Sequence, residues 1–318
     1  MRSAAGTATD SASRSAWELP ALLGQSPEIH RLHLLLDRWV TGSDEEVRLM
    51  IARQMSGRAK HFRPVTLFAC HRAVSTRPPT VRTMRAAAAV EIVHNVSLIV
   101  DDILDRSRFR RGMLSLHCRY GFLPALMTAG YMSHSATALV ADDAYAVRLV
   151  SELMQRLGSA ECLQWRVRRQ PMGVEDWRAV AGADTGSMFE ICARLGTRDD
   201  RLARYGLLLG TLYHGCDDVA DVRGTVALGG GSEKDIIDGI LTLPAAIAIR
   251  DPETAVLFRA AGPATADAIA ERLHASLSEA EAYLDRLAAE AESEARRNAP
   301  RWSGLVDLIA HTRALSVA

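Results

Sequence analysis

E-I-V-H-N-V-S-L-I-V-D-D-I-L-D-R-S-R-F-R-R-G, residues 91–112, is an apolar segment that runs into three aspartates and then into a pair of arginines. Asp101 and Asp105 are four residues apart, so on a helix they share one face, and Asp102 lies about 100° round the axis. Crowded carboxylates repel one another, and burying them uncompensated is costly. An acidic cluster at the end of an apolar helix therefore needs a cation, and oxygen-only ligands indicate a hard one such as Mg²⁺.

The same pattern recurs later in the chain. Asp217, Asp218 and Asp221 follow a second apolar run, L-L-L-G-T-L-Y-H-G-C, and again precede an arginine and a glycine. A single cluster of this kind is most simply a solvated helix end, but two accidental ones are much harder to explain. If the two helices pack side by side, the clusters can face each other across a cavity and hold several divalent ions between them.

Composition favours a helical protein. The chain has 318 residues, 48% of them apolar, which is enough for a sizeable core in one large domain or two ordinary ones. Aromatic residues make up only 5%, whereas Ala, Leu, Arg and Val are plentiful. Because 38 basic residues balance 38 acidic ones, there is no basic excess for nucleic acid and no overall attraction to an anionic membrane.

The cysteines and the chain start suggest where the protein works. Five scattered cysteines form no C-x-x-C, so neither a zinc site nor a disulfide framework is indicated, and a reduced cytoplasmic interior fits best. No apolar run reaches transmembrane length, so we expect no integral membrane protein. Residues 1–20 are rich in Ser, Ala and Thr and lack a signal-peptide core, so we expect a flexible tail, with a transit peptide as a weakly supported alternative.

Helical periodicity and capping residues predict one all-α domain over residues 21–318. The expected helices cover roughly 26–40, 44–55, 65–74, 80–104, 121–139, 142–157, 160–168, 174–195, from 199 to the second cluster, 233–250 with a kink at Pro244, and the segment from 251 on. Basic loops are expected at 56–64 and 106–116 and a hinge at 229–232, and no strand is predicted. The expected architecture is a single-domain bundle of long helices around a central cavity.

Four blocks of sequence resemble those of the trans-type polyprenyl (isoprenyl) diphosphate synthases. They are K-H-F-R-P at 60–64, the 91–112 segment, D-D-V-A-D at 217–221 and D-I-I-D-G-I-L-T-L-P at 235–244. The family's counterparts are G-K-R-L-R-P, E-x-x-H-x-x-S-L-x-x-D-D-x-x-D with R-R-G, a second D-D-x-x-D and D-x-x-x-G-K-x-T-L-P. One block would be a weak signal, but four in order make the chain resemble a divergent member from about residue 27 to about residue 250, with the isoprenoid synthase fold.

The resemblance implies a Mg²⁺-dependent prenyltransferase. An allylic diphosphate loses pyrophosphate and leaves a carbocation, isopentenyl diphosphate attacks that cation through its double bond, and loss of a proton gives a longer polyprenyl diphosphate. The implied direct ligands of about three Mg²⁺ ions are Asp101, Asp105 and Asp217. The other aspartates of the clusters, implied to bind through water or to orient the ligands, are Asp102, Asp218 and Asp221.

The resemblance also implies the residues that hold the two diphosphates. Those implied for isopentenyl diphosphate are Lys60, Arg63, His94 and Arg111. Arg110 is implied to help hold the allylic diphosphate. Two further residues are expected to bind substrate: Thr185, which matches the threonine of a family Lys-Thr pair, and His214, which departs from the family pattern. Arginine suits this role because its planar fork can bind phosphate through two hydrogen bonds. His94 lies about two turns before Asp101 on much the same face, which favours the cavity over an ordinary core position.

Product length in this family is set by the bulk beneath the first cluster. Val96 and Ser97, five and four positions before Asp101, are not aromatic, and Val93 and Val90 further down the helix are modest in size. The cavity floor on this helix therefore looks open, which favours a product of C20 or longer, although another helix could close it.

Several positions depart from the family pattern. Asp184 stands where the family has the lysine of a Lys-Thr pair, and Ile240 where it has the lysine of G-K-x-T-L-P. His214 and Glu161 each stand at a family glutamine. The two missing lysines bind the allylic diphosphate in the family, and Asp184 would repel a diphosphate by several kcal/mol in a dry site and by much less in a wet one.

Three interpretations therefore stay open. The chain is an elongating synthase, a terpene cyclase or prenyltransferase to another acceptor, or a catalytically silent partner subunit. The surviving residues for a second diphosphate favour the first, because a cyclase has none to hold, whereas the altered allylic positions favour the second. Two intact acidic clusters count against the third. The resemblance also implies a homodimer formed through helix faces.

Overall fold

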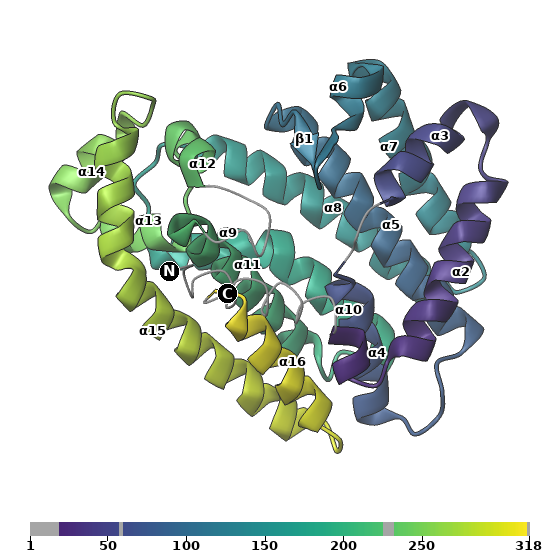
Figure 1. Cartoon of the computed structure of the whole chain (residues 1–318). Coiled ribbons are helices and arrows are strands. Elements are labelled where there is room, and N and C mark those ends of the chain that lie inside the picture. The colour runs from purple at the N-terminus through teal and green to yellow at the C-terminus, as the bar shows by residue number, and fades with distance from the viewer. Residues whose placement is uncertain (1–18, 57–59, 225–231, 317–318) are drawn as a thin grey trace, which may run out of the picture.

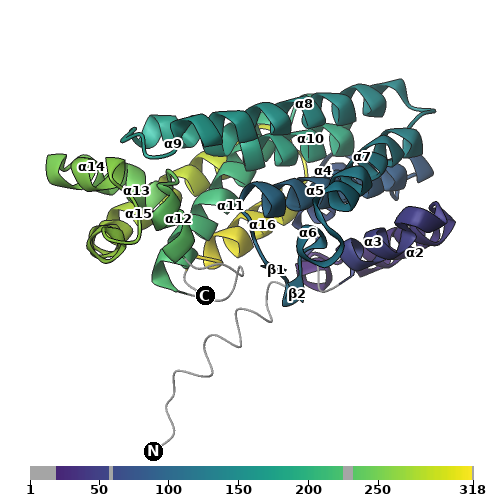
Figure 2. The same ribbon diagram turned by 90° about the horizontal axis from the view of Figure 1, so that it is seen from above.

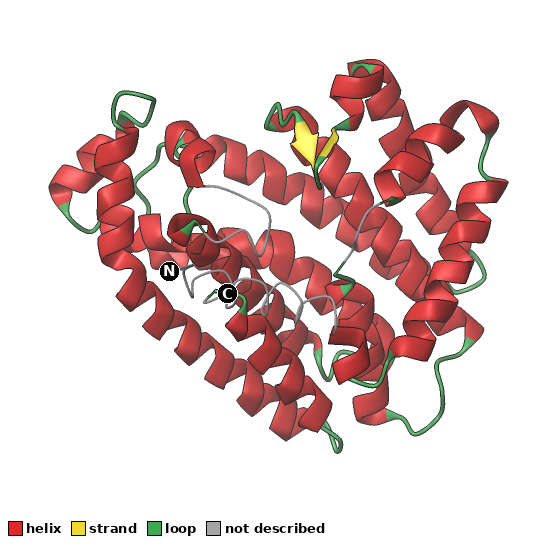
Figure 3. Cartoon of the chain, viewed as in Figure 1, coloured by secondary structure: helices red, strands yellow, loops and turns green. Residues whose placement is uncertain are grey.

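A computed structural model describes residues 19–56, 60–224 and 232–316 (Figure 1). Helices make up nearly all of this part, which confirms the all-α class (Figure 3). The helices of the first half are α2 (Ser26–Gly42), α3 (Glu45–Met55), α4 (Phe62–Val74), α5 (Val81–Leu104), α6 (Leu116–Tyr120), α7 (Phe122–Leu139) and α8 (Ala144–Val167). Those of the second half are α9 (Val174–Ala181), the π-helical turn η1 (Gly182–Gly186), α10 (Ser187–Thr197), α11 (Ala203–Arg223), α12 (Ser232–Asp238), α13 (Leu243–Ala248), α14 (Pro252–Arg259), α15 (Ala266–Asn298) and α16 (Ser303–Ala314).

The short helix α10 forms the centre of the bundle. It packs against α4 and α11 most extensively, and also against α8 and α5 (Figure 2). Its residues from Ser187 to Phe189 and from Ile191 to Thr197 are buried. The two helices that end in aspartate clusters, α5 and α11, are thus held in place by one buried helix that contacts both.

Local sequence explains where α5 begins and why it is buried. The Thr80 hydroxyl accepts a hydrogen bond from the Thr83 amide at 3.2 Å and so caps the helix. A run of four alanines, residues 86–89, follows, and each is almost fully buried. Small side chains let the neighbouring helices approach α5 closely from several sides, so the helix can carry its terminal aspartates into the interior.

The structure differs from the sequence-based prediction in several places. The helix expected at 174–195 is interrupted by the π-helical turn η1, and the loop expected at 56–64 ends inside α4. The helices expected at 142–157 and 160–168 are one helix, α8, because an exposed glycine such as Gly158 costs only about 1 kcal/mol. The segment 233–250 is broken rather than kinked, since Gly239 turns the chain with φ +65° between α12 and α13. Of the hinge expected at 229–232, Ser232 is the first residue of α12 and the rest lies outside the described residues. Residues 1–18 of the expected tail also lie outside them, whereas Leu19 is buried at 1% exposure.

A further difference is a small hairpin in the basic loop after α5. Strands β1 (Phe109–Arg110) and β2 (Met113–Leu114) pair antiparallel. The two residues between them, Arg111 and Gly112, have φ of 52° and 77°. A tight two-residue hairpin turn requires such left-handed residues, which accounts for the glycine of R-R-G. Within the described residues no helix is both long and apolar enough to cross a membrane.

Close packing between α11 and η1 gives a first testable prediction. A Cβ atom at Gly210 would lie 2.7 Å from the Thr185 carbonyl oxygen and 2.8 Å from the Gly186 Cα, both backbone atoms. We expect Gly210→Ala to lower the free energy of unfolding by about 1–3 kcal/mol, measured by urea titration. The control Gly158→Ala, where a Cβ meets nothing within 4 Å, should instead stabilise by about 0.5–1 kcal/mol. Equal effects at the two sites would contradict this packing argument.

Candidate active site

The first acidic cluster closes α5, and two arginines hold two of its carboxylates. The Oδ1 atom of Asp102 accepts hydrogen bonds from Arg110 Nε at 2.9 Å and Arg110 NH2 at 2.7 Å. The Oδ1 atom of Asp105 accepts one from Arg168 NH2 at 2.9 Å. Burial raises the pKa of Asp101 well above its usual value, and the nearby acids Glu161 and Asp184 raise it further. Arg110, which the sequence predicts to help hold a diphosphate, is therefore paired with the Asp102 carboxylate in this structure.

The second cluster closes α11 and is tied to two other helices through Asp218. Its Oδ2 atom accepts hydrogen bonds from Trp177 Nε1 on α9 and from the Leu243 amide at the start of α13, each at 2.8 Å. Burial and the mutual proximity of the carboxylates raise the pKa values of Asp217 and Asp221. The middle aspartate of each cluster is therefore fixed by protein donors.

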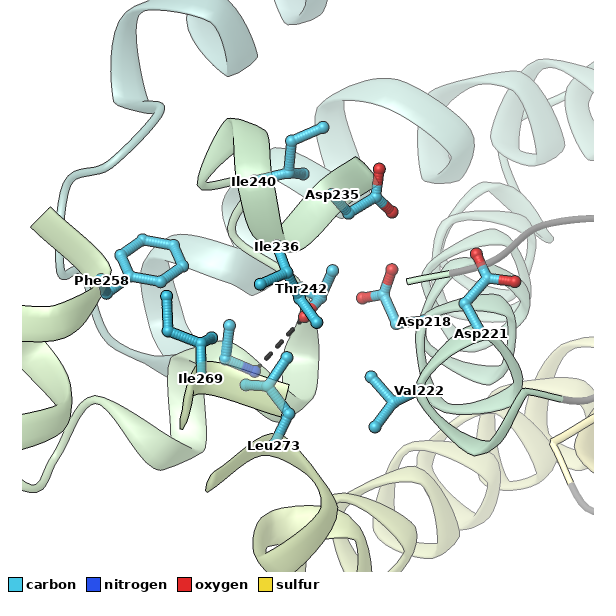
Figure 4. A pocket seen from close by; sticks show the side chains of 11 residues that line it. Asp218, Asp221, Val222, Asp235, Ile236, Ile240, Thr242, Phe258, Ile269 and Leu273 are labelled. Atoms are coloured by element: carbon cyan, nitrogen blue, oxygen red, sulfur yellow. Dashed lines mark hydrogen bonds between the residues drawn. The ribbon is translucent and has the colours of Figure 1, made fainter. Parts of the chain in front are cut away.

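An apolar pocket lies directly beside the second cluster (Figure 4). Asp218, Asp221 and Asp235 line one side of it, and Ile240 lines another. The remaining wall consists of side chains from α12 to α15, including Phe258, Ile269 and Leu273. At position 240, where the resemblance expects a lysine, the chain thus has an apolar side chain in the wall of a pocket rimmed by carboxylates.

Several carboxylate oxygens in the two clusters are buried without a hydrogen-bond partner. They are Oδ1 of Asp101, Oδ2 of Asp102 and Oδ1 of Asp221. In the part of the chain that the structure describes, no three His, Cys, Asp or Glu side chains converge closely enough to hold a metal ion. Mg²⁺ is commonly bound by one or two carboxylates together with substrate phosphate and water. The oxygen donors therefore fit Mg²⁺ ions that bind together with a diphosphate.

Asp184 and His214 form a hydrogen-bonded group with Thr185. The Thr185 hydroxyl donates to Asp184 Oδ2 at 3.0 Å and lies 3.0 Å from His214 Nδ1, which is 3.5 Å from the same Asp184 oxygen. Burial alone lowers the pKa of His214, but the charge of Asp218 and the bond to Asp184 raise it to about 9. His214 is therefore protonated at neutral pH. The charge of His214 opposes that of Asp184, which reduces the repulsion that we expect Asp184 to exert on a diphosphate.

The residues predicted to hold isopentenyl diphosphate lie near one another. Arg63 NH1 is 3.2 Å from His94 Nε2, and the charges of Arg63 and Arg111 both act on His94. Burial first, and then these arginines, lower the pKa of His94 well below its usual value, so His94 is a neutral hydrogen-bonding group. Burial also lowers the pKa of Lys60 to about 8, although Asp217 acts in the opposite direction.

The comparison with known proteins gives the family. A family model described as "Polyprenyl synthetase" matches residues 44–275, a segment that includes both acidic clusters and the basic residues. The chain belongs to the polyprenyl synthetase family.

The chain is also similar to individual relatives and to a solved structure. The chain is 27% identical over 235 residues to a nonaprenyl diphosphate synthase of Mycobacterium tuberculosis, covering 70% of each chain. It is 25% identical over 229 residues to solanesyl-diphosphate synthase 2 of Oryza sativa, covering 67% of this chain but only 57% of that protein. A polyprenyl synthase of Caulobacter crescentus superposes with a TM-score of 0.83 at 21% identity, over 95% of this chain and 97% of that one.

Sequence reasoning missed several residues of the site in this polyprenyl synthetase. Arg168 and Trp177, which bond to Asp105 and Asp218, lie outside all four motif blocks. Asp235 was quoted in the fourth block without a role, yet it lines the pocket at the second cluster. The only signal for Arg168 was a run of basic residues before a proline, which is too common to identify a site.

The raised pKa values in the site predict how stability depends on pH. Burial, followed by the charges of Asp218 and Asp105, raises the pKa of Asp235 from 3.8 to about 7. The folded protein therefore retains a proton that the unfolded chain releases, and stability is lost as pH rises from about 4 to about 7. We expect Asp235→Asn to raise the Tm in EDTA by about 2–5 °C at pH 8 and by less at pH 5. A rise of the same size at both pH values would contradict this assignment.

Proposed function

We propose that this protein is a Mg²⁺-dependent prenyltransferase that condenses an allylic diphosphate with isopentenyl diphosphate to give a longer polyprenyl diphosphate. One observation carries the proposal. The structure combines two clusters of partly unsatisfied carboxylates with a separate group of basic side chains around Arg63. The carboxylate clusters suit an allylic substrate whose diphosphate departs as pyrophosphate. The basic group suits isopentenyl diphosphate, which keeps its diphosphate during the reaction.

The acidic clusters act on the allylic substrate. Asp101, Asp105 and Asp217 would hold the Mg²⁺ ions, which when bound neutralise charge on the departing pyrophosphate. Asp102 and Asp218 fix the ends of α5 and α11 through Arg110 and Trp177, so the ligands need little rearrangement. The allylic C–O bond breaks and its electron pair leaves with pyrophosphate.

The basic group acts on isopentenyl diphosphate. Lys60, Arg63 and Arg111 would bind its diphosphate, with His94 as a neutral hydrogen-bonding partner. The charge of the buried Glu91 acts on Arg111, and the charges of Arg63 and Arg111 act on Glu91, so these groups stabilise one another electrostatically. Held there, the substrate double bond attacks the allylic cation, a new C–C bond forms, and the loss of one proton gives the product.

Other features support the finer parts of the proposal. Val93 and Val96 are buried on α5 and neither is aromatic, which supports a product of C20 or longer. The M. tuberculosis relative is named for a nonaprenyl product, and the C. crescentus structure is described as complexed with calcium and isoprenyl diphosphate. All five cysteines are free thiols, which supports a cytoplasmic location.

Product analysis tests this function. Purified protein with Mg²⁺ is incubated in turn with dimethylallyl, geranyl, farnesyl and geranylgeranyl diphosphate, with and without isopentenyl diphosphate, and extract and headspace are analysed by mass spectrometry. We expect longer diphosphates only when isopentenyl diphosphate is present. Hydrocarbons or alcohols formed without it would establish a cyclase instead. No turnover in any mixture would favour a silent partner subunit or another acceptor.

We propose further that the protein forms a homodimer through α7. Four large apolar side chains in the first turns of this helix are exposed: Phe122, Leu123, Leu126 and Met127. Helical geometry puts them on one face, which continues along the helix at Gly130 and His134. An apolar helix face of this size in water marks an interaction site, and a second copy of the chain would cover it.

The α7 face gives a testable prediction. We expect Leu123→Glu combined with Met127→Glu to convert the dimer into a monomer, because two like charges would be buried opposite their copies. Mass measured by light scattering should then fall by half. Leu49→Glu, at an exposed leucine on α3, is the control and should leave the mass unchanged. A wild-type protein that is monomeric at micromolar concentration would contradict the proposal.

A further inference from the structure

The site has less positive charge for an allylic diphosphate than its family pattern leads one to expect. Asp184 is acidic and paired with His214, and Ile240 is apolar. Arg110, the nearby cation of the hairpin, already bonds to Asp102 through two of its nitrogens. A diphosphate bound at Asp101 and Asp105 would therefore need another cation.

Arg168 extends from the end of α8 directly to the first cluster. Its NH2 donates to Asp105 Oδ1 at 2.9 Å, and its NH1 lies 3.8 Å from Asp238 Oδ2 at the end of α12. The guanidinium carbon is 4.4 Å from the centroid of the Trp165 ring, and the side chain is only 16% exposed. Its Nε atom is buried and has no hydrogen-bond partner in the described structure. An unused buried donor costs free energy, so it points to a ligand acceptor.

The residue after Arg168 fixes this part of the backbone. The amide of Arg169 donates to the Gly239 carbonyl at 2.8 Å, and its side chain donates to the carbonyls of Ile237 at 3.0 Å and Ala261 at 2.9 Å. A Cβ at Gly239 would lie 2.5 Å from the Arg169 Cγ, so only glycine fits there. Arg169 therefore has a structural role, and it holds Arg168 between α5 and α12.

We propose that Arg168 binds the diphosphate of the allylic substrate and supplies the positive charge that Asp184 and Ile240 do not. The inference rests on the proposed function, whose allylic substrate it concerns. A guanidinium with an unused Nε and two NH2 groups can bind two phosphate oxygens at once. Without substrate the NH2 and NH1 nitrogens of Arg168 face Asp105 and Asp238, and the Nε atom has no partner in the described structure. A bound diphosphate would give all three nitrogens acceptors.

Separate Michaelis constants for the two substrates test this role. We expect Arg168→Met to raise the KM for farnesyl diphosphate by about 10–100-fold, the range for losing a hydrogen bond to a charged group, while the KM for isopentenyl diphosphate changes less than about twofold. Arg168→Lys should recover part of the loss. Arg166→Met, which removes an exposed arginine from the last turn of the same helix, is the matched control and should change neither constant.

Two results would overturn the proposal. One is an equal rise in both Michaelis constants, and the other is a lower Tm with both constants unchanged, as expected if Arg168 only joins α5 to α12. A binding measurement separates this proposal from the proposed function. Calorimetry with Mg²⁺ and farnesyl S-thiolodiphosphate, which does not ionise readily, should show weaker binding for Arg168→Met even if isopentenyl diphosphate proves not to be the acceptor. Failure of the wild type to bind this analogue would also refute the role of Arg168.

Discussion

Replacing Asp101 by asparagine is expected to lower turnover by about three orders of magnitude while leaving the fold intact. The change keeps the shape of the side chain but removes a charged oxygen ligand, and electrostatic stabilisation of a leaving group by bound metal is worth several kcal/mol, at about 1.4 kcal/mol per tenfold in rate. Initial rates with saturating Mg²⁺ and both substrates measure the effect.

The Tm of Asp101→Asn distinguishes a loss of turnover through lost metal binding from a loss through unfolding. Burial and the neighbouring acids Glu161 and Asp184 raise the pKa of Asp101, so the carboxylate destabilises the metal-free protein at neutral pH. Asp101→Asn should therefore have a Tm in EDTA equal to or above that of the wild type. Asp142→Asn, at a carboxylate in an exposed ion pair with Arg85, is the control and should keep full turnover. Wild-type turnover in Asp101→Asn would exclude it as a metal ligand.

Replacing Asp184 by lysine is expected to destabilise the protein by about 1–3 kcal/mol, because the change breaks a half-buried charge pair and sets a second cation against His214. Adding His214→Gln removes the like charge. The double variant should therefore recover most of the lost stability and bind the allylic diphosphate about tenfold more tightly than the wild type, since the site gains a net positive charge. Urea titration and the KM for farnesyl diphosphate measure the two effects.

The pH dependence of the pair gives an independent check. The pKa of His214 is raised from 6.5 to about 9, so the stabilisation from the Asp184–His214 pair is complete below pH 6.5 and is lost as pH rises through 9. His214→Gln should remove this dependence, whereas the exposed His134, replaced in the same way, should leave it unchanged. A double variant that is no more stable than Asp184→Lys alone would contradict the coupling of the two residues.

Local patterns in the sequence predicted the elements that carry the site. The bounds of α5 follow from Thr80 as a cap and from an apolar run that ends at Asp101, and both signals lie within one helix. The turn at Arg111 and Gly112 could also have been predicted, because a glycine in a short basic segment between apolar residues favours a tight hairpin.

Contacts between distant segments could not be predicted in this way. His214 lies 30 positions from Asp184 and 29 positions from Thr185, and Arg168 lies 63 positions from Asp105. Each pair depends on how α8, η1 and α11 pack around α10, and no periodicity in the chain encodes that arrangement. For the same reason, Asp184 taken alone suggested a repulsive site, whereas the folded chain contains a neutral pair.

The most direct test of the central claim is the release of pyrophosphate from farnesyl diphosphate and Mg²⁺, followed with and without isopentenyl diphosphate. If ionisation serves chain elongation, pyrophosphate should appear only when isopentenyl diphosphate is present, with one molecule released for each isopentenyl unit consumed. Release at an unchanged rate without isopentenyl diphosphate would contradict the account and show that the allylic cation has another fate.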